Sequence, residues 1–214
     1  TETEVSEATR MATFTPGNDE ARKAAAKLNV PRIGVRFRLP ASMNQVEYFG
    51  RGPAENYLDR NAGSMVGLYK STAEELYFPY VRPQENGHHT DTRWVSLSTG
   101  KKGLLIQADN TIGFNALRNS IEDFDDEEAT GLSRQWSNFT PEQVANHDEA
   151  AAKNVLRRQH HINNITPRDF VEVCVDLKQQ GVAGYDSWGS RPEPAYTLPA
   201  NREYNWGFTL IPLK

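Results

Sequence analysis

Val171-Glu172-Val173-Cys174-Val175-Asp176-Leu177 is the stretch in which apolar and polar residues alternate most strictly. Successive side chains of a β-strand point to opposite faces of a sheet, so this alternation predicts a strand with one apolar face. Cys174 falls on the other face, together with the two acidic residues. The pattern is typical of an antiparallel sheet that buries one of its sides.

Similar but weaker alternation recurs along the rest of the chain. The other strands predicted in this way are residues 33–39, 45–50, 94–97, 104–108, 112–117 and 204–210. A polar segment separates residues 94–97 from 104–108, which indicates a hairpin. Short strands punctuated by Pro and Gly, without β–α alternation, predict an all-β antiparallel sandwich.

Helical signals are sparse. Thr140 before Pro141 is a capping residue followed by proline at a first helical position, which predicts one short helix over residues 141–147. Residues 21–28 are rich in alanine but are bounded by turn-forming residues, so the sequence favours neither a helix nor a loop there.

Composition excludes several classes of function. The 214 residues include 28 acidic and 24 basic ones, a net charge of -4, which argues against a nucleic-acid partner. The single cysteine excludes an intramolecular disulfide and a cysteine-based zinc site.

No apolar run approaches the roughly 20 residues of a membrane span, so we expect a soluble protein of undetermined compartment. Residues 1–10 lack a signal-peptide core and begin without Met, and we expect a piece of a longer polypeptide.

Residues 48–60 leave a predicted strand and then concentrate polar and aromatic side chains in a loop. One interpretation is a loop that binds a hydroxylated ligand. The alternative is a loop that satisfies itself, with Asp59 and Arg60 holding backbone groups. The sequence leaves both open.

Residues 77–94 contain candidate acid–base groups. Glu85, His88 and Arg93 would suit proton transfer to a sugar if the fold brings them together. His88 and His89 are adjacent, so in an extended chain they face opposite ways and are poor ligands for one metal ion. The same argument applies to His160, and we expect no metal site.

Residues 184–190 place Trp188 between polar and small residues just past a predicted strand. An indole ring covers the apolar C–H face of a sugar, and Asp186 and Ser187 offer hydrogen bonds beside it. The alternative is a tryptophan folded back onto its own sheet. The chain contains neither a G-x-S-x-G nucleophile motif nor a phosphate-binding glycine loop, and its surroundings mark out no pair of carboxylates for glycoside hydrolysis.

These three stretches resemble the C-terminal, small-chain-like domain of the large β-galactosidases, in the glycoside hydrolase family that also holds β-glucuronidases. The resemblance runs from about residue 31 to the C-terminus, whereas residues 1–30 match poorly. The matching segments are Glu47-Tyr48-Phe49-Gly50-Arg51-Gly52-Pro53-Ala54-Glu55-Asn56-Tyr57 with Asp59-Arg60, Pro79-Tyr80-Val81-Arg82-Pro83-Gln84-Glu85-Asn86-Gly87 with Thr92-Arg93, and Gly184-Tyr185-Asp186-Ser187-Trp188.

The resemblance implies a large antiparallel supersandwich over residues 31–214, similar to galactose mutarotases and truncated at its N-terminal side. It also implies that the catalytic glutamates lie in a separate barrel, so we assign no catalytic residue and no cofactor to this chain. The predicted substrate-binding residues are Trp188, Asp186, Ser187, Glu85, Asn86, His88 and Arg93.

The expected partners are a galactoside, the upstream domains of the same chain and a second copy in a homodimer. The exposed strand edges and apolar surface of a truncated sandwich would favour such self-association. We also weigh a stand-alone carbohydrate-binding or purely structural sandwich, and a mutarotase-like epimerase that uses His88 or His89 with Glu85.

Overall fold

The computed structural model describes residues 29–124, 162–186 and 190–214. The helix predicted over residues 141–147, the alanine-rich residues 21–28, Ser187 and Trp188 lie outside these ranges. Within them the molecule is all-β, with seven strands and three short 3-10 turns, which confirms the predicted antiparallel class.

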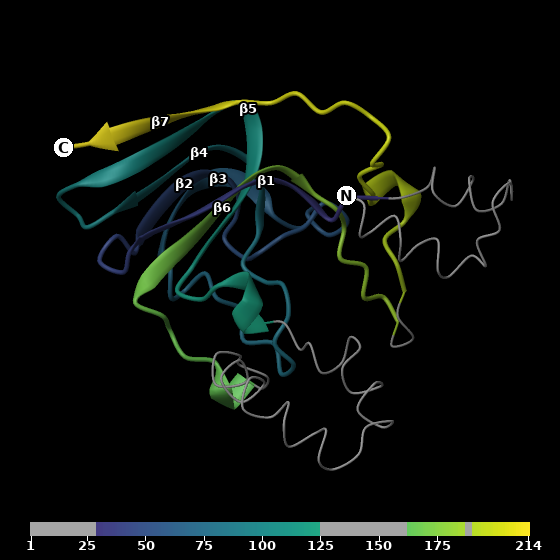
Figure 1. The fold of residues 1–214 in the computed structure, drawn as a ribbon, viewed down its shortest axis with the longest axis horizontal. Coiled ribbons are helices and arrows are strands. Elements are labelled where there is room, and N and C mark those ends of the chain that lie inside the picture. The colour runs from purple at the N-terminus through teal and green to yellow at the C-terminus, as the bar shows by residue number, and fades with distance from the viewer. Residues whose placement is uncertain (1–28, 125–161, 187–189) are drawn as a thin grey trace, which may run out of the picture.

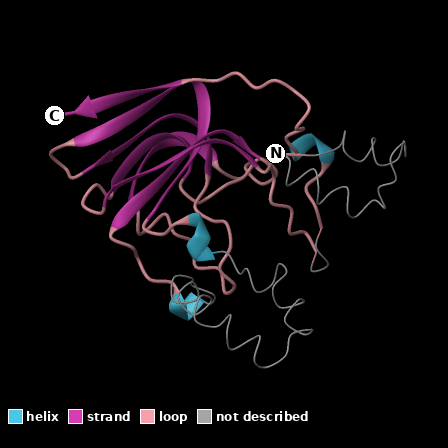
Figure 2. Ribbon diagram, viewed as in Figure 1, coloured by secondary structure: helices cyan, strands magenta, loops and turns pink. Residues whose placement is uncertain are grey.

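The seven strands form one antiparallel sheet in the order β1-β6-β5-β4-β2-β3, and β7 pairs with β5 outside this path. Figures 1 and 2 show that the sheet is strongly curved, with the helical turns at its margin. The strands are β1 (Arg32–Pro40), β2 (Gln45–Gly52), β3 (Met65–Thr72), β4 (His89–Ser98), β5 (Gly103–Leu117), β6 (Phe170–Gln179) and β7 (Phe208–Leu213). The turns are η1 (Ile121–Phe124), η3 (Ile162–Asn164) and η4 (Pro194–Tyr196).

Strand β5 organises the sheet. One of its edges pairs with β4, while its other edge pairs with β7 over residues 103–108 and with β6 over residues 113–117. The two strands predicted at 104–108 and 112–117 are therefore one strand of 15 residues. The alternation did not predict β3, and it placed the start of β7 four residues too early.

The apolar core lies on the face of β6 that carries the valines. It combines residues of β2, β4, β5 and β6 with residues of the connecting loops, and among its fully enclosed members are Tyr48, Val95, Leu97, Ile106, Phe114, Val171, Val173 and Val175. This is the burial that the period-two pattern predicts.

The expectation that β6 buries only one face is wrong. Glu172, Cys174 and Asp176, on its second face, are 3%, 3% and 0% exposed. Arginine side chains of β1 make this burial tolerable, because Arg38 Nε lies 3.0 Å from a Glu172 oxygen and Arg32 Nε lies 3.1 Å from Asp176 Oδ2. Buried carboxylates need such partners.

In the part of the chain that the structure describes, no helix is long and apolar enough to span a membrane.

Candidate functional site

Two of the three polar stretches pack directly against each other. The Glu55 carboxylate accepts the Gly87 backbone N–H at 2.6 Å, and the Asn56 backbone N–H donates to the His88 carbonyl at 2.7 Å. The Asn56 side-chain oxygen also accepts the backbone N–H and the hydroxyl of Thr90. The loop that follows β2 is therefore fastened to the segment that leads into β4.

Arg60 and Tyr80 complete this contact. Both donate hydrogen bonds to the Glu55 carboxylate, and the Arg60 guanidinium lies 4.7 Å from the centre of the Tyr57 ring. The Asp59 carboxylate accepts backbone N–H groups of Val182 and Ala183, residues 123 and 124 positions away in the sequence. The interpretation that Asp59 holds backbone groups is confirmed, whereas Arg60 holds side chains instead.

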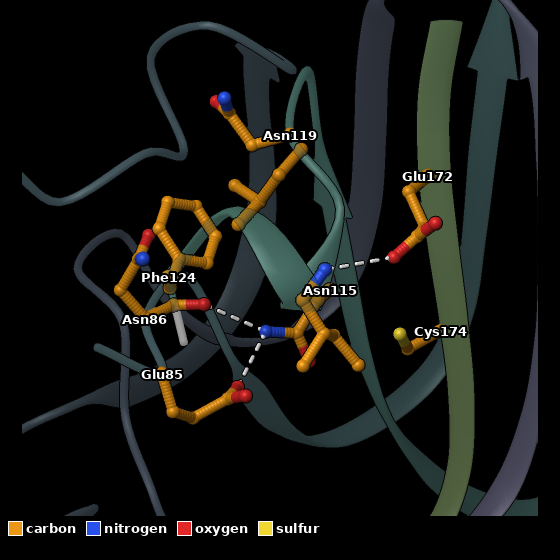
Figure 3. A pocket seen from close by; sticks show the side chains of 9 residues that line it. Glu85, Asn86, Asn115, Asn119, Phe124, Glu172 and Cys174 are labelled. Carbon is orange, nitrogen blue, oxygen red and sulfur yellow. Dashed lines mark hydrogen bonds between the residues drawn. The ribbon is translucent and has the colours of Figure 1, made fainter. Parts of the chain in front are cut away.

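Glu85, Asn86 and Asn115 line one pocket, and the Asn115 side chain contacts the other two residues (Figure 3). The Asn115 amide nitrogen donates to Glu85 Oε1 at 3.0 Å and to the Asn86 carbonyl at 2.7 Å. Glu172 and Cys174 face the same pocket from β6. The residues that line it are Glu85, Asn86, Asn115, Leu117, Asn119, Ile121, Phe124, Glu172 and Cys174.

Arg32 joins this pocket to the buried acid of β6. One terminal nitrogen donates to Glu85 Oε1 at 3.2 Å and to Asn115 Oδ1 at 2.8 Å, while Nε lies 3.1 Å from Asp176 Oδ2. Burial acts against the charge on Arg32, but the carboxylates of Glu85 and Asp176 outweigh it and raise the pKa of the guanidinium. Arg32 therefore remains charged at the centre of the cluster.

Asp176 is an acid whose charge is poorly compensated. Burial raises its pKa to about 7, against the opposing effect of Arg32, and the neighbouring Glu85 carboxylate raises it further. The contact with Arg32 is an ion pair without hydrogen-bond alignment, since neither carboxylate oxygen has a hydrogen-bond partner. His88 Nδ1 lies 3.8 Å from the same oxygen.

His88 and His89 are both enclosed, at 2% and 1% exposed. His88 Nδ1 lies 2.8 Å from Asn115 Oδ1 and must carry the proton, because the Asn115 amide nitrogen is already donating to Asn86. Burial, and secondarily Arg32, lowers the pKa of His88 to about 3, and burial also lowers that of His89. The rings are neutral near neutral pH, and acid–base chemistry by either one would need access that this packing does not provide.

The other predicted contacts have separate surroundings. The Asn86 side chain is consumed by the backbone, since it accepts the Phe78 N–H and donates to the Gln84 carbonyl. Arg93 donates to the Asp91 carbonyl and lies over the ring of Phe49.

Asp186 is exposed and accepts the Ser190 backbone N–H at 3.2 Å. The structure thus brings Glu85 and His88 together through Asn115, while Arg93 contacts Asp91 and Phe49.

Sequence reasoning missed Arg32, Asn115 and Asp176. The alternation assigns Asp176 to the face opposite the valines, but it gives no sign that this face is also covered.

Among the residues that the structure describes, no group of three or more His, Cys, Asp or Glu side chains is placed to hold a metal ion.

The chain is similar in sequence to one protein family and to several curated proteins. The family described as "Beta galactosidase small chain" matches residues 3–210. A β-galactosidase of Priestia megaterium is 34% identical over 209 residues, 94% of this chain and 17% of the relative. β-Galactosidases of an Arthrobacter species and of Vibrio cholerae are 41% and 29% identical over 111 and 181 residues, which are 49% and 85% of this chain. The chain spans between 11% and 17% of the length of these three relatives.

Proposed function

This chain belongs to the β-galactosidase small chain family, and from that premise we propose that it is the C-terminal part of a β-galactosidase. In this proposal the chain contributes a contact to the galactoside, while the catalytic glutamates lie in another domain of the same polypeptide. The acids that are buried here support that division, because Glu55, Glu172 and Asp176 are each held by an arginine. Carboxylates paired in this way hold the fold together rather than face a substrate.

The observation that carries the proposal is the meeting of loops distant in sequence. Hydrogen bonds join the loop after β2 to the segment before β4 through Glu55 and Gly87, and to the loop after β6 through Asp59 and Val182. Three different family motifs lie in three loops that hydrogen bonds join into one cluster, and this supports a shared role at one surface. Loops set on a rigid sheet commonly carry binding residues.

We assign the galactoside contact to the residues of these loops that keep an accessible polar group. Glu85 has a side chain that is 27% exposed, with one oxygen held by Arg32 and Asn115. Asp186 is exposed on the loop after β6, and Trp188, the aromatic residue of the same motif, supplies the apolar surface. Asn86 and His88 serve to hold the loops in this proposal, because their polar side-chain groups already have protein partners.

The isolated chain is expected not to hydrolyse a chromogenic β-galactoside. The physical reason is that retaining or inverting hydrolysis needs two carboxylates set roughly 5–9 Å apart around the glycosidic bond, which we place in another domain. The measurement is release of the chromophore against a blank without protein. Turnover well above the blank would refute the assignment of the chemistry to another domain.

Weak galactoside binding is expected for the isolated chain, with a dissociation constant near millimolar, or about -4 kcal/mol. Trp188→Ala should reduce the affinity, because it removes the aromatic face that covers the sugar. Galactose titration followed by tryptophan fluorescence measures both proteins, and Trp206→Phe, a ring packed against Phe208, is the matched control. Equal or absent responses in wild type and Trp188→Ala would favour a purely structural domain.

We also propose that the chain forms a homodimer in solution. Its outermost strands keep apolar side chains accessible, namely Met65, Val66 and Leu68 on β3 and Leu210, Ile211 and Leu213 on β7. Unpaired strand edges with exposed apolar residues favour association. Light scattering should give about twice the chain mass of 24.1 kDa, whereas a monomer at all concentrations would exclude the dimer.

A further inference from the structure

The Asp59 carboxylate bridges two loops that are far apart in the sequence. Its Oδ1 accepts the Val182 N–H at 3.1 Å, and its Oδ2 accepts the Ala183 N–H at 2.7 Å. Two N–H donors on one carboxylate form a charge-assisted pair, which is stronger than hydrogen bonds between neutral groups. Asp59 is therefore well suited to fix the direction in which the chain leaves β6.

The backbone that Asp59 holds is a tight turn. Ala183 and Gly184 have φ angles of 51° and 86°, and only glycine adopts such values without strain. A non-glycine residue in this conformation needs support from its surroundings. The two N–H groups that donate to Asp59 belong to Val182 and Ala183, at the start of this turn. Tyr185 and Asp186 follow directly after Gly184.

Gly181 makes room for the carboxylate. A Cβ atom at this position would lie 2.5 Å from Asp59 Cγ and 2.9 Å from Asp59 Cβ, and the nearest atoms it would meet all belong to Asp59. The close approach of the Gly181 backbone and the Asp59 side chain therefore depends on the missing side chain of Gly181.

Asp59 lies in a turn between Tyr57 and Arg60. The Arg60 N–H donates to the Tyr57 carbonyl at 2.9 Å, and the Tyr57 ring stacks on His88 at a centroid distance of 5.4 Å. Because Tyr57 and His88 are buried, the turn that contains Asp59 is attached to the enclosed part of the fold.

We propose that Asp59 is the positioning residue for the galactoside-facing loop that begins at Gly184 and carries Asp186. The inference rests on the proposed function for the role of Asp186, but the link between Asp59 and the turn stands on the geometry alone. Asp59 does not touch the sugar in this proposal; it acts through the backbone of Val182 and Ala183.

The test compares amide exchange and sugar affinity in Asp59→Ala and Asp59→Asn. Loss of the carboxylate should speed exchange of the Val182 and Ala183 amides about tenfold, because each loses its acceptor. Affinity for methyl β-galactoside, followed by NMR shifts of the Asp186 amide, should fall about tenfold, as expected when a contact residue is misplaced. Asp59→Asn keeps one acceptor oxygen and should lie between wild type and Asp59→Ala.

Gly181→Ala approaches the same contact from the other side. Its new methyl group would displace the Asp59 carboxylate, so the single variant should reproduce the effects of Asp59→Ala. Combined with Asp59→Ala, the substitution should add less than it costs alone, because the contacts with Cγ and Oδ2 are then removed and only the 2.9 Å contact with Cβ remains. Asp169→Asn, an exposed acid before β6, is the matched control and should change neither readout.

The outcomes separate this inference from the proposed function. Fast exchange at Val182 and Ala183 with normal sugar binding would overturn the positioning role, and so would unchanged exchange in both Asp59 variants. If wild type itself does not bind methyl β-galactoside, the proposed function fails, and exchange in the Asp59 and Gly181 variants alone decides whether Asp59 fixes the turn. Should Asp59→Ala not fold, Asp59→Asn and Gly181→Ala provide the same comparison.

Discussion

Replacing Arg32 with methionine is expected to lower the free energy of unfolding by about 3–5 kcal/mol at about pH 8. Arg32 is the positive group beside the carboxylates of Asp176 and Glu85, and its side chain is only 18% exposed. Methionine keeps the aliphatic volume but removes the counterion of Asp176, which must then either stay charged and buried without compensation or take up a proton. Breaking a buried pair in this way costs much more than removing both partners.

The loss should become smaller near pH 5, because Asp176 can then take up a proton and no longer needs a cation. Urea unfolding followed by circular dichroism at both pH values measures the effect. Arg36→Met is the matched control: Arg36 also lies on β1 and contacts Glu122, but its side chain is 41% exposed. It also lies 3.5 Å from the buried Glu172, which keeps Arg38 as a partner in this variant. The substitution should cost less than about 1 kcal/mol, and equal losses in the two variants would contradict the central role of Arg32.

Asp176→Asn should make the chain sensitive to mild acid, with a loss of about 2 kcal/mol between about pH 8 and pH 5. The cause is His88, whose pKa is about 3 in the fold but near 6.5 in an unfolded chain. The unfolded state therefore binds a proton below about pH 6.5 that the folded state rejects, and stability falls as the pH falls. His89, whose pKa burial also lowers, adds a loss of the same sign.

In wild type Asp176 opposes this loss. Its pKa of about 7 lies above the usual aspartate value of 3.8, so the folded state takes up a proton between about pH 8 and pH 5 that the unfolded state does not. That uptake stabilises the fold on acidification by about 2–3 kcal/mol, an amount that offsets most of the histidine loss. Wild type should thus show a much flatter pH profile than Asp176→Asn.

Denaturant midpoints over the same pH range test this balance. His88→Gln is the complementary variant and should gain stability on acidification, because it removes one proton that only the unfolded chain binds. Parallel pH profiles for wild type and Asp176→Asn would show that Asp176 is already ionised throughout and would overturn the explanation.

Local pattern was enough to predict β1, β2 and β6 to within two residues at each end and parts of β4 and β7, because alternation with period two reports directly on which side chains meet a core. It failed for β3, whose sequence Met65-Val66-Gly67-Leu68-Tyr69-Lys70-Ser71-Thr72 does not alternate and which pairs with β2 along its length. It also divided β5 in two, since its polar residues 109–111 interrupt the apolar pattern while the strand continues there. Pairing between backbones, which leaves no mark in side-chain type, decided both cases.

The sequence by itself determined that the chain is an all-β antiparallel protein, that Cys174 and the acids of β6 face away from the valines, and which three stretches carry the family resemblance. Only the tertiary structure decided that this second face is buried, that Arg32 links Glu85 with Asp176, and that Asp59 reaches Val182. The physical reason is distance along the chain. A periodic pattern records the environment of one segment, whereas an ion pair or a loop bridge depends on how segments 53 to more than 120 residues apart are folded together.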